Sequence, residues 1–111
     1  MIRYILSFVF LCTISFAQQS QKAGVDCLLL VDENSIICKY TQIRVDHEKT
    51  VTFQWIDPKG EISRSRDMNI PALHGSVYDY RYIKGRSSGK WTFKVIDGEK
   101  EYTTNFTIDA Q

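Results

Sequence analysis

The sequence predicts an all-β protein, a two-sheet antiparallel sandwich of about seven short strands. From Val25 onward, apolar and polar residues alternate in short runs, and no run has the 3.6-residue period of an amphipathic helix. Turn-forming residues separate these runs. Each predicted strand has one apolar face, so a second sheet has to cover the first, and 111 residues suffice for one such domain. A closed barrel is the alternative.

Residues 1–17 differ from the rest of the chain and have the three parts of a secretory signal peptide. Arg3 gives the positive charge, an almost wholly apolar stretch follows, and small residues precede the expected cleavage site after Ala17. The apolar stretch is too short for a stable membrane anchor. We therefore expect export to the periplasm or cell surface, with no membrane span after cleavage. A flexible leader at 18–24 and one domain at 25–111 would remain.

Cys12 lies in the apolar stretch and raises the alternative of a lipoprotein signal. Leu11 directly precedes it, where lipoprotein signals have a small residue, so the sequence disfavours lipid anchoring through Cys12. Two cysteines, Cys27 and Cys38, remain after cleavage. An even pair in an oxidising compartment predicts one disulfide.

The first predicted hairpin joins strands at 25–31 and 35–44 through a polar turn. If this turn is centred on Asp32-Glu33, position i faces position 65 − i, and Cys27 lies directly opposite Cys38. A turn one residue further on would place the two cysteines diagonally, where they are less suited to bridging. The alternative of a redox or metal site lacks both CxxC spacing and a histidine at a zinc-motif interval.

The second predicted hairpin joins strands at 50–56 and 61–66. Asp57-Pro58-Lys59-Gly60 between them has the residues of a type I turn. The second strand is polar and charged, which suits an edge strand because charge discourages pairing with another molecule. Residues 67–75 are expected to cross between the two sheets.

The segment 76–83 has three tyrosines on one face and Asp79 and Arg81 on the other. We expect the tyrosines to face the core, because the opposite face is charged. The alternative is a recognition surface, since tyrosine offers a large contact area with few rotatable bonds. The tyrosines are Tyr78, Tyr80 and Tyr82. A flexible loop is expected after this segment, at 84–89.

The last predicted hairpin joins strands at 90–96 and 99–108 through Asp97-Gly98, a preferred type I′ pair. A turn centred on this pair sets Phe93 opposite Tyr102 and places the apolar residues of both strands on one face. A slip of one residue would disrupt that face. The large residues expected to fill the interior of the sandwich are Phe53, Trp55, Tyr80, Trp91, Phe93, Tyr102 and Phe106.

Four stretches within 51–108 carry a family resemblance. They are V-x-F-x-W-x-x-P-x-G at 51–60, Y-x-Y near Tyr80, G-K-W-T-F-K-V at 89–95 and F-x-I at 106–108. Together they resemble small exported bacterial domains of the immunoglobulin-like type, which are mostly uncharacterised and include lipoproteins. The resemblance implies an immunoglobulin-like sandwich and no catalytic residues. The cysteine hairpin differs from the sheet-to-sheet bridge of antibody domains, so antibody function is not implied.

Charge and motifs argue against several functions. With 14 basic and 13 acidic residues, the net charge of +1 is far from that of a dedicated nucleic-acid binder. His47 and His74 are general-base candidates by residue type alone, and a hydrolase would need one of them beside an acid in a cleft. Met68 and His74 are candidate copper ligands, but two ligands are too few for a site. We therefore expect no enzyme activity, no cofactor and no metal.

The remaining functional hypothesis is a non-catalytic binding or assembly module that contacts an envelope protein. The expected contact regions are the edge strand at 61–66 and the segments 67–75 and 84–89. The alternative is a carrier of a small ligand or carbohydrate, which an aromatic row open to solvent in a pocket would favour over a sealed core. The candidate interaction residues are Arg64, Arg66, Arg81, Lys84 and Arg86. The simpler interpretation of these charges is a solvated strand face that binds no partner.

Overall fold

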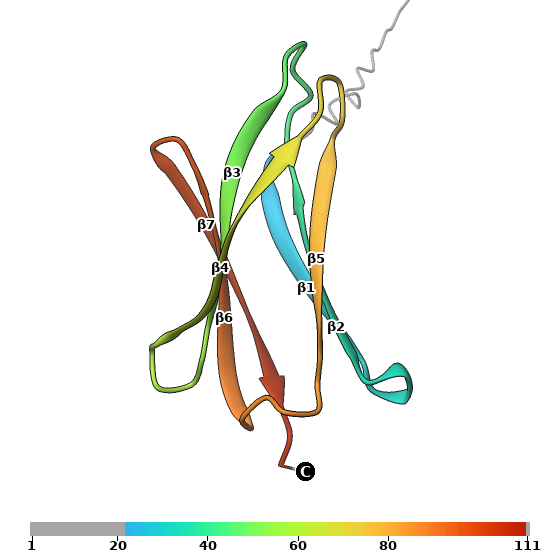
Figure 1. Cartoon of the computed structure of the whole chain (residues 1–111), viewed down its shortest axis with the longest axis vertical. Helices are drawn as coiled ribbons and strands as arrows, with labels where there is room; N and C mark the ends of the chain where they lie inside the picture. Colours follow the sequence, from blue (N-terminus) through green and yellow to red (C-terminus); the bar gives the residue numbers. More distant parts are fainter. Residues whose placement is uncertain (1–21, 111) are drawn as a thin grey trace, which may run out of the picture.

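Two antiparallel sheets, one of three strands and one of four, pack face to face in a computed structural model that describes residues 22–110 (Figure 1). The smaller sheet has the order β1-β2-β5 and the larger sheet the order β4-β3-β6-β7. This confirms the all-β sandwich and rules out the closed barrel. The strands are β1 (Gly24–Leu30), β2 (Ser35–Thr41), β3 (Lys49–Ile56), β4 (Ile62–Ile70), β5 (Ser76–Tyr82), β6 (Gly89–Asp97) and β7 (Lys100–Ile108), with a short 3-10 helix η1 (Val31–Glu33).

The expected signal peptide at 1–17, with Cys12, lies outside the described residues, as does most of the leader at 18–24. Gly24 already belongs to β1. Between residues 22 and 110, no helix is long and apolar enough to cross a membrane.

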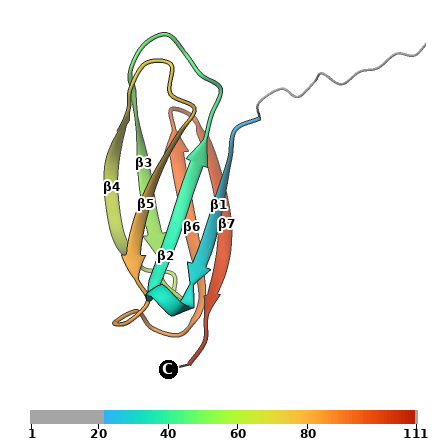
Figure 2. The ribbon, with the colours of Figure 1, turned by 90° about the vertical axis from the view of Figure 1, so that its right-hand side faces the viewer.

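The two long sides of the sandwich are closed differently. On one side β1 contacts β7, and on the other β5 approaches β4 (Figure 2). The core between the sheets is aromatic, with Trp55 packed edge-on against Phe93 and Phe106 at centroid distances of 5.2 and 5.9 Å. Its buried side chains are Ile36, Cys38, Tyr40, Val51, Phe53, Trp55, Ile70, Trp91, Phe93, Val95, Phe106 and Ile108.

The first hairpin has the predicted register. Cys27 pairs with Cys38 across β1 and β2, and the two cysteines form a disulfide. The turn consists of η1 followed by Asn34, whose left-handed backbone (φ 54°) lets its N–H donate to the carbonyl of Val31. Turn geometry and cysteine placement thus agree, which is why this register was predictable.

The second hairpin has its predicted turn, but its second strand is longer than expected. The carboxylate of Asp57 accepts hydrogen bonds from the backbone N–H groups of Lys59 and Glu61, each at 2.9 Å. Residues 67–70, expected to cross between sheets, instead extend β4 because β3 begins early enough to pair Lys49 with Ile70. Burial of Ile70 in the core favours this extension.

The register predicted for the last hairpin is wrong by two residues. Asp97 pairs with Lys100, and Phe93 lies opposite Thr104 rather than Tyr102. The two turn residues are therefore Gly98, with φ +63°, and the residue after it, whose φ is not positive, a pattern typical of a type II′ turn. A shift of two residues keeps every side chain on its face, so the apolar face survives.

The tyrosine prediction is also wrong. Tyr78, Tyr80 and Tyr82 point outward and are between 54% and 61% exposed, whereas Asp79 is only 5% exposed. The cause is the pairing of β5 with β2, which sets Asp79 beside the inward-facing Cys38. The expectation failed because it assumed that the charged face of the strand must be the solvated one.

A polar contact ties the two sheets together near the last hairpin. The Tyr40 hydroxyl donates to the Asp97 carboxylate at 2.7 Å, and Lys49 forms an ion pair with the same carboxylate at 2.9 Å. Burial, reinforced by the hydrogen bond and charge of Asp97, raises the pKa of Tyr40 far above its usual range. Burial also acts to raise the pKa of Asp97, but the hydrogen bonds from Tyr40 and Lys49 and the charges of Lys49 and Lys100 outweigh it and lower that pKa below 3.8.

Replacing both cysteines (Cys27→Ser with Cys38→Ser) should lower the free energy of unfolding by about 3 kcal/mol, because the disulfide restricts the unfolded chain. Urea denaturation of the oxidised protein and the double variant measures this difference. The intact mass of the protein, with and without reductant, is the control. Two free thiols before reduction would contradict the prediction.

The Tyr40–Asp97 contact should make stability fall at both ends of the pH range. Below about pH 3.8 the unfolded chain takes up the Asp97 proton before the folded chain does, so stability is lost as the pH falls through the lowered pKa. Above pH 10.0 the unfolded chain releases the Tyr40 proton while the folded chain keeps it, so stability is lost as the pH rises. Urea denaturation across this pH range should show that Asp97→Asn loses less stability at acidic pH than the wild type does. An unchanged acid-side slope would contradict the assignment.

Candidate functional site

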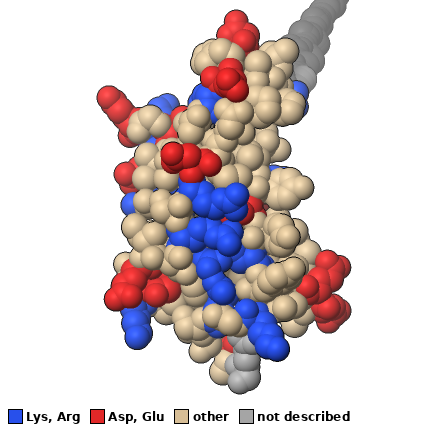
Figure 3. All heavy atoms as spheres, in the orientation of Figure 1, with Lys and Arg blue, Asp and Glu red and all other residues tan. Residues whose placement is uncertain are grey.

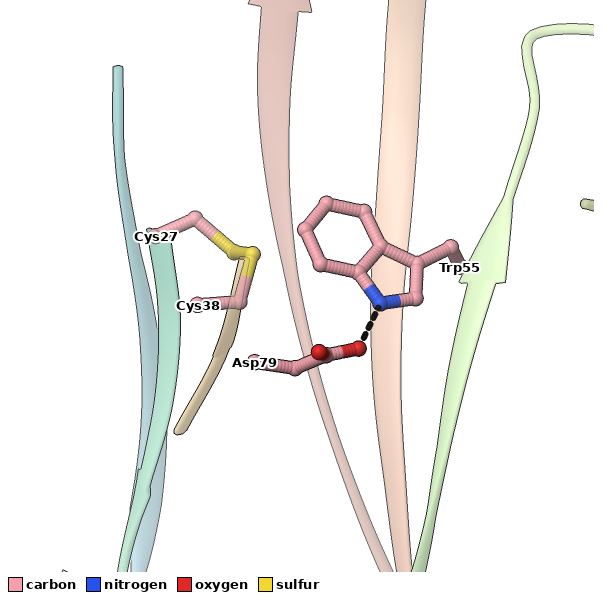
Figure 4. Close-up of a disulfide and its surroundings, with 4 residues drawn as sticks. All are labelled: Cys27, Cys38, Trp55 and Asp79. Carbon is pink, nitrogen blue, oxygen red and sulfur yellow. Dashed lines mark hydrogen bonds between the residues drawn. A yellow bond between two sulfur atoms is a disulfide. The ribbon is translucent and has the colours of Figure 1, made fainter. Parts of the chain in front are cut away.

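The side of the sandwich where β4 approaches β5 is closed by a polar cluster. At its centre, the Asp79 carboxylate on β5 accepts a hydrogen bond of 3.0 Å from the indole N–H of Trp55 in the opposite sheet (Figure 4). Arg64 and Arg66 on β4 pair with the same carboxylate at 3.2 and 3.0 Å. A buried charge is tolerated when it is paired and hydrogen-bonded in this way. Asp79 therefore joins the two sheets.

A third arginine completes this cluster. Arg81 lies two residues after Asp79 and shares its inward face; its guanidinium donates to the hydroxyl of Ser63 at 3.1 Å. The guanidinium carbon lies 5.4 Å from the centre of the Trp55 ring, within the range of a cation–π interaction. Both strands that border this seam, β4 and β5, thus carry positively charged side chains.

The loop after β5 adds two more basic residues. Asn34 in the first hairpin holds this loop, accepting a hydrogen bond from the N–H of Lys84 at its side-chain oxygen (2.8 Å) and from the N–H of Ile83 at its carbonyl (3.1 Å). The N–H of Arg86 then donates to the carbonyl of Ile83 at 3.0 Å. These bonds position Lys84 and Arg86 beside the arginine cluster.

These side chains surround one surface hollow of about 320 Å³. All five basic residues proposed from the sequence line it, with Asp79 as the one acid among its lining residues. Figure 3 shows Lys and Arg gathered along this face of the molecule, with acidic side chains mainly toward its margins. We call this feature the basic hollow; its lining residues are Arg64, Arg66, Asp79, Tyr80, Arg81, Tyr82, Lys84 and Arg86.

An aromatic surface borders the basic hollow. Tyr78, Tyr80 and Tyr82, which we call the tyrosine strip, stand on the outer face of β5, and the rings of Tyr80 and Tyr82 meet edge-on at 6.2 Å. Across the smaller sheet, Tyr80 lies opposite Ile37, which lies opposite the exposed Leu28. Exposed aromatic side chains beside positive charge are typical of contact surfaces.

The other candidates from the sequence do not assemble into a site. His47 is exposed, and its ring nitrogen lies 3.3 Å from the carboxylate of the neighbouring Asp46, which is 94% exposed. His74 is exposed in the connection between β4 and β5, while Met68 packs against the core. Among residues 22–110, no group of three or more metal-ligating side chains comes together.

Asp79 is the site residue that the sequence analysis missed. The sequence contained evidence for it. Two arginines on the same face of a predicted edge strand need an acid to balance their charge, and Trp55 needs an acceptor for its indole N–H when buried.

No protein-family model matches the chain, and no curated protein matches its sequence.

Replacing the central carboxylate (Asp79→Asn) should lower the free energy of unfolding by about 2–4 kcal/mol, because it leaves Arg64 and Arg66 facing each other across an uncharged group. The matched control is Asp67→Asn, an exposed acid on β4 that accepts a hydrogen bond from Thr52 at 2.9 Å. The control should cost less than about 0.5 kcal/mol. Equal losses in urea denaturation would show that Asp79 does not tie the sheets.

Proposed function

We propose that the chain is an exported, non-catalytic binding module that contacts an envelope protein through the basic hollow and the tyrosine strip. The observation that carries this proposal is that five basic side chains gather around one buried acid, next to three exposed tyrosines. The chain as a whole has a net charge of only +1, so this concentration of positive charge is local.

Electrostatics and composition favour an acidic partner. A surface hollow with one sign of charge raises the local concentration of oppositely charged groups and accelerates their association. Tyrosine and arginine are also among the residues that most often dominate the binding energy of protein interfaces. The tyrosine strip would supply contact area, and the basic hollow would supply orientation.

Export is supported by the disulfide between Cys27 and Cys38. Disulfides persist in oxidising compartments and are rare in the cytosol. Together with the signal-peptide pattern at 1–17, the disulfide favours the periplasm or cell surface as the place where the module works.

A carrier of an acidic carbohydrate is the second candidate, and one observation favours it. Tyr80 and Tyr82 are open to solvent and line the basic hollow, whereas the core between the sheets is sealed. A sealed core favours a protein-binding module, and an open aromatic row in a pocket favours a carrier. The experiment must therefore separate a protein partner from a polysaccharide.

Affinity capture of the tagged, exported protein from its native envelope tests the proposal. The test variant combines Tyr80→Ala with Lys84→Glu, two exposed side chains that do not bond to Asp79, and the matched control is Lys90→Glu on the outer face of β6. We expect the wild type and control to recover the same protein, and the test variant at least about tenfold less of it.

Thermal melting of the three proteins checks that the test variant remains folded. Equal recovery by all three folded proteins would refute the proposal. Recovery of a polysaccharide without a protein, lost in the test variant, would replace it with the carrier.

A further inference from the structure

Strand β5 has an edge that no other strand covers among residues 22–110. It is the outer strand of the smaller sheet, and its neighbour across the seam, β4, belongs to the other sheet. An outer strand presents a row of backbone N–H and C=O groups that can pair with another extended chain. Such strand addition is a common way of recognising peptides.

The two faces of β5 would contact two different kinds of side chain on an added strand. The outward face carries Tyr78, Tyr80 and Tyr82, and the inward face carries Asp79 and Arg81. A strand added beside β5 would continue both faces, because side chains alternate with a period of two residues. Every second side chain would lie against the tyrosine strip, and the others would point into the basic hollow.

The chemistry of each face defines the partner. Side chains that enter the basic hollow meet Arg64, Arg66, Lys84 and Arg86, which favour carboxylates. The hollow of about 320 Å³ has room for roughly ten water molecules and therefore for the ends of two acidic side chains. Side chains against the tyrosine strip gain most if they are apolar.

We infer that the edge of β5 binds an extended segment of the partner protein in which acidic and apolar residues alternate. This inference rests on the proposed function and specifies the partner's sequence pattern. Charge argues against a second copy of this chain in the same place, because pairing two β5 edges would bring Arg81 and the basic hollow of one copy against those of the other.

A short capped peptide in which glutamate alternates with valine and threonine is the probe, added to the full exported domain. The control peptide has the same composition with all the glutamates at one end. We expect the alternating peptide to bind at least about tenfold more tightly by fluorescence anisotropy. We also expect it to slow hydrogen exchange of backbone amides in β5 but not in β7, the outer strand of the larger sheet.

The same variants locate the site on the surface. Tyr80→Ala and Lys84→Glu should each weaken binding of the alternating peptide at least about fivefold, while Lys90→Glu should leave it unchanged. No binding, equal binding of both peptides, or binding without protection of β5 amides would overturn the inference. If capture of the envelope protein still depends on Tyr80 and Lys84 in that case, the proposed function stands and the pattern of the partner is different.

Discussion

The arrangement of the seam between β4 and β5 depends on the buried carboxylate of Asp79. It accepts a hydrogen bond from Trp55 and pairs with Arg64 and Arg66, so three side chains of the larger sheet converge on one residue of the smaller sheet. Because side chains on a strand alternate, turning Asp79 inward turns Tyr78 and Tyr80 outward. One buried acid therefore both fastens the sheets and exposes the aromatic surface.

The sequence predicted most of the fold where local and long-range constraints agreed. In the first hairpin, the turn and the Cys27–Cys38 pair require the same register, which the structure has. In the last hairpin, a shift of two residues leaves the apolar face intact, so the pattern alone cannot choose between registers. The choice is consistent with the contact of Asp97 with Tyr40, a residue 57 positions away, which holds Asp97 in the strand and moves the turn to Gly98.

The five basic residues of the candidate site were predictable, but Asp79, the exposure of the tyrosines and the geometry were not. The five basic residues lie in the charged edge strand at 61–66 and in the segment from Arg81 to Arg86, and folding gathers all of them around one hollow. Alternation in β5 separates its two faces without saying which one is buried. The buried face is set by the pairing of β5 with β2, which places Asp79 beside Cys38, and Arg64 and Arg66 become its partners only when the two sheets meet.

Stability alone does not explain why this seam is polar. Replacing a buried ion cluster with apolar residues of similar volume commonly leaves a protein equally stable or makes it more stable. The arginines therefore contribute little to stability that a packed apolar core would not. Among residues 22–110, no ion pair joins β1 to β7 across the opposite seam. Asp79 neutralises part of the positive charge around it, and the remaining positive charges repel one another when nothing is bound. The acidic segment that we propose as the partner would relieve that repulsion, which would give the polar seam a role beyond folding.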